Sequence, residues 1–373
     1  MASVQKVLDA RVGALRRGDE SAFLATLDPE APDEFRRSQA QSFEGLRALP
    51  LAFYRLTART ADSGDLSTGL SARYGGARVF LPETRQTYRF RDYDDRDAVD
   101  SLWLTFVERG GRWYVGGDDD LSALGVDTAR NVWDLGPVQV KRTAHFLVIS
   151  HPAQAARADV LAGIAEEAMA TLNSRWDRPW SDRIPLILPG SVHELETTLQ
   201  TTFDLNNFVA FVAYGTVRDR DWQTTAPRIY IQDQNLERYP RRFQTATLVH
   251  ELSHAAAAPL DGPFVPAWVH EGVAEWVAKG ALSRPKGSDG RLPRDYEFTT
   301  GKPSDILLSY DESHSAIGYL GAHDGEHTPT LLLTALGTPK VAPGSVDEHV
   351  DDTLRRLLNE PFDIFQQDWS HNR

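Results

Sequence analysis

Two histidines and a glutamate stand close together in HELSH, residues 250–254. On a helix, positions i and i+4 lie on the same face, so the rings of His250 and His254 can meet at one point. Two imidazoles in this arrangement bind zinc well. Glu251, one step round the helix, can reach a water molecule on that metal. The spacing therefore predicts a zinc centre with a carboxylate beside it.

A zinc centre with an open coordination position needs a third protein ligand. The segment WVHEGVAEW, residues 268–276, follows on a second helix that is expected to begin at Pro266. The loop 259–265 lets this helix fold back on the first, so that Glu271 faces the histidine pair. Glu271 is therefore the expected third ligand.

The same segment offers two other donors. Glu275 lies at i+4 from Glu271 on the same helix face, and His270 is a suitable donor on a neighbouring face. Glu275 has a second expected role, because metal-binding histidines usually need a partner that orients the imidazole. Both alternatives to Glu271 stay open at the level of sequence.

HExxH followed by a Trp-x-x-Glu-Gly-x-Ala helix resembles the gluzincin metallopeptidases of clan MA. The resemblance covers residues 140–373. It implies that His250, His254 and Glu271 bind one zinc ion and that Glu251 is the general base. It also implies a peptide or protein substrate, and a sheet before the motif helix with a helical part after it.

In that family a Tyr or His beyond the third ligand stabilises the charge that develops on the substrate carbonyl. The segment SYDESHSAIGYL, residues 309–320, contains Tyr310, His314 and Tyr319. The resemblance favours His314, and Tyr310 is the alternative. A third interpretation, in which neither side chain reaches the zinc, stays open.

The N-terminal part is predicted to begin with helices. Residues 4–17 carry apolar side chains at a helical period, and Gly18 ends the run. Asp19 is expected to cap a second, short helix. Aromatic and β-branched runs from Leu51 onward then indicate strands. Helices followed by an antiparallel sheet predict an α+β domain over residues 1–120.

Two details of this sheet are specific. GLSARY at 69–74 is grouped with the strand-like runs, and the pair Gly110 and Gly111 is expected to form a hairpin turn. With RRGDESAFLATLDPEA and WLTFVERGGRWYVGGDDD, the domain resembles the cone-shaped nuclear-transport-factor-two-like, or SnoaL-like, superfamily. Such cones serve as enzymes, ligand pockets or interaction modules, so this fold predicts little about function.

Residues 121–138 mix acidic, Gly and Pro positions and are the expected linker. The second predicted domain, residues 139–373, is of zincin type, with a mixed sheet, an active-site helix and a helical C-terminal part. The whole chain is predicted to be α+β. Its expected strands are HFLVIS, IPLIL, NFVAFVAY and RIYIQ, and its expected helices cover 152–173, 241–258 and 266–279.

Composition excludes several classes of function. The 373 residues have a net charge of −13, which argues against a nucleic-acid surface or a binder of anionic membranes. The apolar runs are too short to cross a bilayer. With no cysteine, any metal must be held by His, Asp or Glu. The N-terminus has no secretory signal, so the chain is expected to be cytoplasmic unless a leader has been removed.

Two functions of different class follow from these observations. The first is a zinc-dependent peptidase, and the second is a catalytically inert peptidase-like module that acts in binding or regulation. Glu251 favours the peptidase, because an inert relative has no need of the general base. The oligomeric state is not indicated by the sequence.

Overall fold

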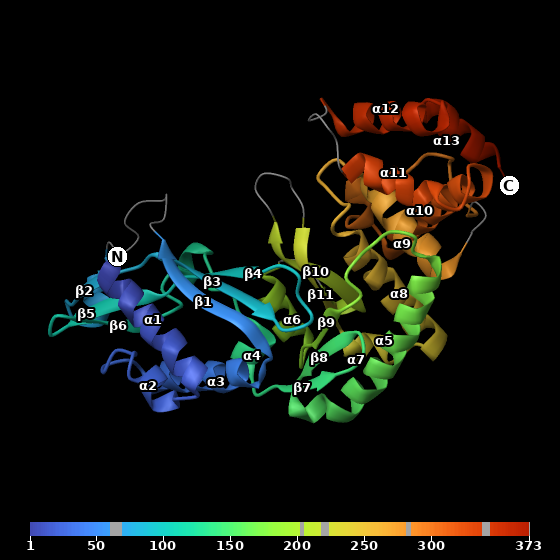
Figure 1. Ribbon diagram of the computed structural model, residues 1–373. Helices are drawn as coiled ribbons and strands as arrows, with labels where there is room; N and C mark the ends of the chain where they lie inside the picture. The colour runs from blue at the N-terminus through green and yellow to red at the C-terminus, as the bar shows by residue number, and fades with distance from the viewer. Residues whose placement is uncertain (60–68, 202–204, 218–223, 281–284, 338–343, 373) are drawn as a thin grey trace. The chain divides into compact units, whose positions relative to one another are not determined.

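The computed structural model mixes helices and small sheets along the chain, which confirms the predicted α+β class (Figure 1). The chain divides into two compact units. The predicted domain boundaries at 120 and 139 stay a prediction. Unit 1 comprises Met1–Val160, Arg183–Phe208 and Tyr230–Asn235, and unit 2 comprises Leu161–Asp182, Val209–Ile229 and Leu236–Arg373. The structure describes residues 1–59, 69–201, 205–217, 224–280, 285–337 and 344–372.

Helices open unit 1 as expected. Gly18, at φ 68°, ends the first helix, and the Asp19 side chain accepts a hydrogen bond from the backbone of Ala22 at the start of the second. A third helix was not predicted, because polar residues such as Gln39 and Ser42 lie on its buried face. The three helices are α1 (Ala2–Arg17), α2 (Glu20–Leu24) and α3 (Asp33–Ala48).

Antiparallel strands form two three-stranded sheets in unit 1, with the orders β1-β3-β4 and β2-β5-β6. Gly110 and Gly111, at φ 55° and 76°, join β5 to β6, which confirms the predicted hairpin. The strand prediction for GLSARY is wrong: Leu70–Tyr74 is a 3-10 helix between two glycines with positive φ. The strands are β1 (Leu51–Arg59), β2 (Arg78–Phe80), β3 (Glu83–Phe90), β4 (Ala98–Leu102), β5 (Thr105–Arg109) and β6 (Arg112–Gly117).

Trp133, in the segment expected to be a linker, is buried in the core of unit 1. It lies on the short helix α4 (Val132–Leu135) and meets the rings of Tyr88 and Phe90 edge-on, each at 5.7 Å. A Cβ on Gly45 would lie 2.1 Å from the Trp133 carbonyl oxygen. This glycine therefore allows α3 to approach α4 closely.

A five-stranded sheet has the order β10-β11-β9-β8-β7. The predicted runs HFLVIS and IPLIL form the fully buried strands β8 and β9, which pair in parallel. β10, from NFVAFVAY, is at an edge of the sheet. The elements are β7 (Gln139–Arg142), β8 (Phe146–Ser150), α5 (Ala155–Arg175), β9 (Ile184–Leu188), α6 (Val192–Leu199), β10 (Ala210–Val217), β11 (Thr224–Ile231) and α7 (Asp233–Leu236).

The C-terminal part of unit 2 is helical, as predicted. In Figure 1, α8, α9 and α10 follow one another from yellow to orange and pack side by side. Within the part of the chain that the structure describes, no helix is long and apolar enough to span a membrane. The helices are α8 (Arg241–Ala257), α9 (Ala267–Lys279), α10 (Pro303–His323), α11 (Thr328–Gly337), α12 (Val346–Leu358) and α13 (Phe362–His371).

Candidate metal centre

Two helices carry the predicted ligands. Pro240 precedes α8 and Pro266 precedes α9, and each proline takes the N-cap position. α8 is rich in alanine and leucine, both strong helix formers, and buries most of its second half. The loop between Ala257 and Pro266 turns the chain, so that α9 packs against α8. Both predicted helices are therefore confirmed.

Gly272 explains why glycine follows the third expected ligand. A Cβ at this position would lie 2.6 Å from both the Ser313 carbonyl oxygen and Cγ1 of Ile317, two residues of α10. No side chain fits in that space, so α10 packs directly on the backbone of α9. This close approach fixes the rotation of α9, and with it the direction of Glu271.

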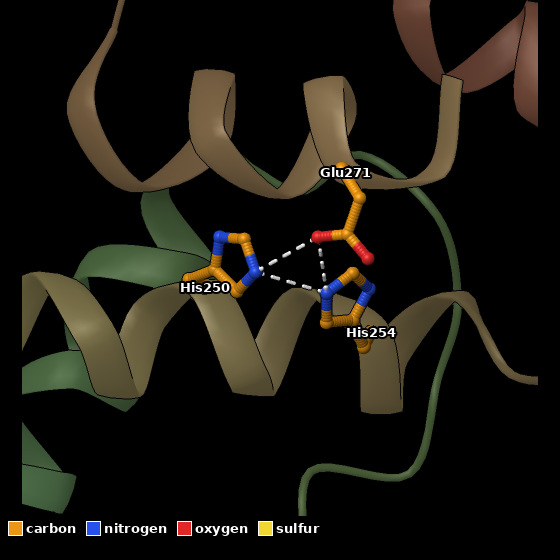
Figure 2. Close-up of side chains that lie close together, drawn as sticks. All are labelled: His250, His254 and Glu271. Carbon is orange, nitrogen blue, oxygen red and sulfur yellow. Dashed lines mark hydrogen bonds and ion pairs between the residues drawn. The ribbon is translucent and has the colours of Figure 1, made fainter. Parts of the chain in front are cut away.

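Figure 2 shows the rings of His250 and His254 on α8 pointing toward the carboxylate of Glu271 on α9. The two Nε2 atoms lie 3.0 Å apart. Oε2 of Glu271 is 3.2 Å from Nε2 of His250 and 3.3 Å from Nε2 of His254. The structure thus brings all three expected ligands together.

The spacing of these three atoms fits a tetrahedral metal ion. Zinc bound at about 2.0–2.1 Å in tetrahedral geometry holds its donors roughly 3.3 Å apart, close to the three distances seen here. The oxygen of Glu271 that faces the rings is buried and accepts no hydrogen bond of normal geometry. Two imidazoles and a carboxylate with no cysteine suit zinc, and a cation at their centre would satisfy the buried oxygen.

The charges around the centre favour a cation. Burial lowers the pKa of His254 to about 4, so this ring is neutral and its nitrogen can bind a metal. Burial opposes the ionised form of Glu271, yet His254 and His250 hold the pKa of this carboxyl well below its usual range. For His250, burial is outweighed by Glu271 and Glu275, which raise the pKa to about 10. Metal binding must therefore displace a proton from His250.

Glu251 lies beside the donor set without joining it. Its side chain is buried, and a backbone hydrogen bond from Val212 on β10 reaches its carboxylate. Burial raises the pKa of Glu251 to about 7. A carboxyl group with a pKa near neutrality can both accept and return a proton.

Glu275 lies where the expected orienting role would place it. Its Oε1 lies 3.1 Å from Nδ1 of His250, on the side of the ring away from the other ligands. Lys279, one turn further along α9, forms an ion pair with the same carboxylate. Although burial opposes ionisation, His250 and Lys279 lower the pKa of Glu275 to about 2. The charged carboxylate therefore fixes the ring of His250.

Tyr310 and His314, both on α10, lie in different surroundings. The Tyr310 ring is 6.2 Å from the His250 ring and packs edge-on against Phe298 at 5.2 Å. Burial, followed by the charge of Glu271, raises the pKa of Tyr310, so the hydroxyl stays protonated. His314 is buried and contacts the Gly280 carbonyl through Nε2 and Glu275, at 3.9 Å, through Nδ1. The preference for His314 over Tyr310 finds no support in these contacts.

Three further residues lie near the donor set, and only His270 has an expected role in the sequence. His270 was weighed as a ligand, but its Nε2 lies 2.9 Å from Oδ2 of Asp261, in the loop before α9. Tyr214 on β10 points toward α8, with its hydroxyl 3.5 Å from the His254 carbonyl oxygen. Asp261 and Tyr214 gave no signal, because their proximity to the ligands depends on the folded chain and not on spacing.

Comparisons with known proteins add no family to this geometry. No protein-family model matches the chain, and no curated protein matches it. The evidence for a metal centre therefore rests on the residues themselves.

Proposed function

We propose that the chain is a zinc-dependent peptidase. The observation that carries this proposal is the convergence of His250, His254 and Glu271 on one point, with donor atoms 3.0 to 3.3 Å apart. A buried glutamate with a pKa of about 7 stands beside that point. A zinc site without catalysis needs the three ligands but has no need of the Glu251 carboxylate.

Each residue would contribute a separate step. Zinc, when bound, supplies a Lewis acid that makes water more acidic and polarises a carbonyl group. Glu251 takes a proton from the attacking water onto its carboxylate and returns it to the leaving amine. The Tyr310 hydroxyl, which stays protonated, donates a hydrogen bond to the carbonyl oxygen as negative charge develops there.

The edge strand supports a peptide as the substrate. β10 lies at an edge of its sheet, and the backbone of Val212 in this strand contacts Glu251. An extended peptide can pair with such an edge through main-chain hydrogen bonds, which would set a peptide bond beside the general base. Protein and peptide substrates share this chemistry.

The test compares bound metal and peptide cleavage in the wild type and in Glu251→Gln. We expect about one zinc per chain in both proteins, and chelator-sensitive cleavage of a broad peptide library by the wild type alone. Glu312→Gln is the matched control, because Glu312 is also a buried glutamate of unit 2 but contacts Ser288. It should cleave like the wild type. Cleavage that survives in Glu251→Gln, or a wild type without metal, would refute the proposal.

A wild type that binds zinc and cleaves no peptide would favour the second function, a peptidase-like binding module. In that case Glu251→Gln should bind zinc like the wild type, and neither protein should cleave a peptide. Metal content and cleavage are measured on the same preparations, so the two functions are separated by one set of experiments.

A further inference from the structure

The two ligand histidines are held in different ways. His250 has a carboxylate partner on its far side, since Nδ1 lies 3.1 Å from Glu275. His254 has no second carboxylate partner of this kind: among the described residues, its ion pair is with the candidate ligand Glu271, and its buried Nδ1 makes no hydrogen bond. Metal-binding imidazoles usually need such a partner to fix the ring. Some other contact must therefore orient His254.

The ring of His270 supplies a contact of a different kind. It lies parallel to the His254 ring, with the centroids 4.3 Å apart and the planes inclined by 17°. His270 is on α9, directly before the ligand Glu271, so the stack joins the two ligand-bearing helices. A flat ring against one face of His254 restricts rotation about its side-chain bonds.

Asp261 in turn fixes His270. Its Oδ2 lies 2.9 Å from Nε2 of His270, and its Oδ1 accepts a hydrogen bond from the backbone of Gly262 at 2.8 Å. Both oxygens of this carboxylate are thus engaged. His270 is not one of the converging donors: its Nε2 contacts Asp261, its Nδ1 is 3.9 Å from Glu271, and the cluster of donor atoms consists of His250, His254 and Glu271.

The loop that carries Asp261 is itself held against α11. A Cβ on Gly337, the last residue of α11, would lie 1.8 Å from the Leu260 carbonyl oxygen. A Cβ on Gly262 would lie 2.7 Å from the Gly337 carbonyl oxygen. Backbone touches backbone at this point, so the position of Asp261 is set by main-chain packing and not by a mobile side chain.

We propose that Asp261 and His270 are the positioning pair of the ligand His254. The loop fixes the carboxylate, the carboxylate fixes the imidazole of His270, and the stacked ring holds His254 at the angle that metal binding requires. The pair takes the place of the hydrogen-bonding partner that Nδ1 of His254 lacks. This inference rests on the proposed zinc centre, but it concerns metal affinity and does not depend on peptide cleavage.

Zinc affinity, measured on the full chain by competition with a chromophoric chelator, tests this pair. We expect His270→Ala to raise the Kd by about 10- to 100-fold, as for other partners of metal ligands. Asp261→Ala keeps the stacked ring but removes its anchor, so it should raise the Kd by a smaller factor. His270→Phe keeps a flat ring but loses the contact with Asp261, so it should bind zinc about as well as Asp261→Ala and better than His270→Ala. His327→Ala is the matched control. It removes the histidine of a second His–Asp pair in unit 2, in which Nδ1 of His327 contacts Asp177, and it should bind zinc like the wild type.

Thermal unfolding of the metal-free proteins separates positioning from general damage. His270→Phe is expected to unfold within a few degrees of the wild type. Wild-type affinity in His270→Ala would overturn the inference, and so would His270→Phe binding as weakly as His270→Ala, because the stack would then not be the cause. A wild type that binds no zinc would overturn both this inference and the proposed function. Zinc binding without cleavage would count against the peptidase. The zinc affinities of the Asp261 and His270 variants relative to the wild type would still test the role of these two residues.

Discussion

At the scale of single residues, the proposed centre would separate the groups that bind the metal from the group that moves a proton. His250, His254 and Glu271 face one another closely enough that two imidazole rings and a carboxylate share one small volume. Glu251 is excluded from that volume and keeps a pKa near 7 because it is buried. In the proposed enzyme, these four adjacent side chains would have two distinct tasks, set by their direction and surroundings.

The hydroxyl of Tyr310 and the ring of His314 can be told apart by substitution. Tyr310→Phe removes one hydrogen-bond donor and leaves the ring against Phe298, so we expect kcat/KM for peptide cleavage to fall by about 10²-fold while zinc affinity is unchanged. His314→Gln should retain a side chain that can donate to the Gly280 carbonyl oxygen and should cost much less activity. A larger loss in His314→Gln than in Tyr310→Phe would restore the assignment that the family pattern favours.

At the scale of elements, the centre depends on how α9 is rotated between α8 and α10. Gly272 sets that rotation, because the backbone of α10 occupies the space where a side chain would lie. The glycine next to Glu271 therefore belongs to the packing of three helices and has no chemical role of its own.

Gly272→Ala should separate α9 from α10. Overpacking of this kind costs about 1–3 kcal/mol of unfolding free energy, and the shift of Glu271 should also weaken zinc binding. Gly163→Ala is the control, since a Cβ at Gly163 on α5 meets nothing within 4 Å. That variant should be neutral or more stable by about 0.5–1 kcal/mol. Thermal unfolding and chelator competition measure both effects. Equal stability and equal zinc affinity of the two variants would contradict the role of close packing between α9 and α10.

In unit 1, a short helix makes stability depend on pH. Burial raises the pKa of Asp134 on α4 from 3.8 to about 6, against hydrogen bonds from Asn131 and Ser42 that lower it. The folded chain then binds this proton more tightly than the unfolded chain does. The contribution of Asp134 to the free energy of unfolding therefore falls as pH rises from about 4 to about 6, and stays constant above that range.

Asp134→Asn should remove this dependence while keeping an oxygen for the backbone of Asn131. Denaturant unfolding of the two proteins at several pH values measures it. The stability of the variant relative to the wild type is expected to increase from pH 4 to pH 6. Parallel profiles over that range would show that the Asp134 carboxyl titrates alike in the folded and unfolded chain.

At the scale of the whole molecule, the proposed zinc centre lies within one of the two compact units. All three ligands, together with Glu251, Glu275 and Tyr310, belong to unit 2. Binding a metal to the folded state alone stabilises that state by mass action. The gain should be local, because the ligands join α8 to α9 directly.

Hydrogen exchange with and without zinc measures this local gain. Adding zinc to the metal-free chain should slow exchange of backbone amides in α8 and α9, and should leave α1 and α3 of unit 1 unchanged. Replacing His250 and His254 by alanine provides the control and should abolish the difference. Equal protection of α1 and α8 on addition of zinc would show instead that the units respond together.

The sequence indicated the ligand set because a helix converts the spacing of His250 and His254 directly into proximity. Prolines and glycines at helix ends allowed α8 and α9 to be predicted, because these residues act on the local backbone. α3 escaped prediction because it buries Gln39 and Ser42, which hydrophobic periodicity counts as exposed. The contact of Asp261 with His270 escaped it too, because a loop position is set by the packing of Gly337.

The ligands also occupy a narrow window of the chain. His250, His254 and Glu271 lie on two consecutive helices, whereas Tyr310 belongs to the next one. During synthesis, the complete donor set therefore leaves the ribosome before the hydroxyl group does. Contacts between near neighbours in sequence form quickly, so a nascent chain that ends after α9 already holds every ligand. The chain would then bind zinc before Tyr310 is synthesised, and a growing chain could take up the metal before it could cleave a peptide.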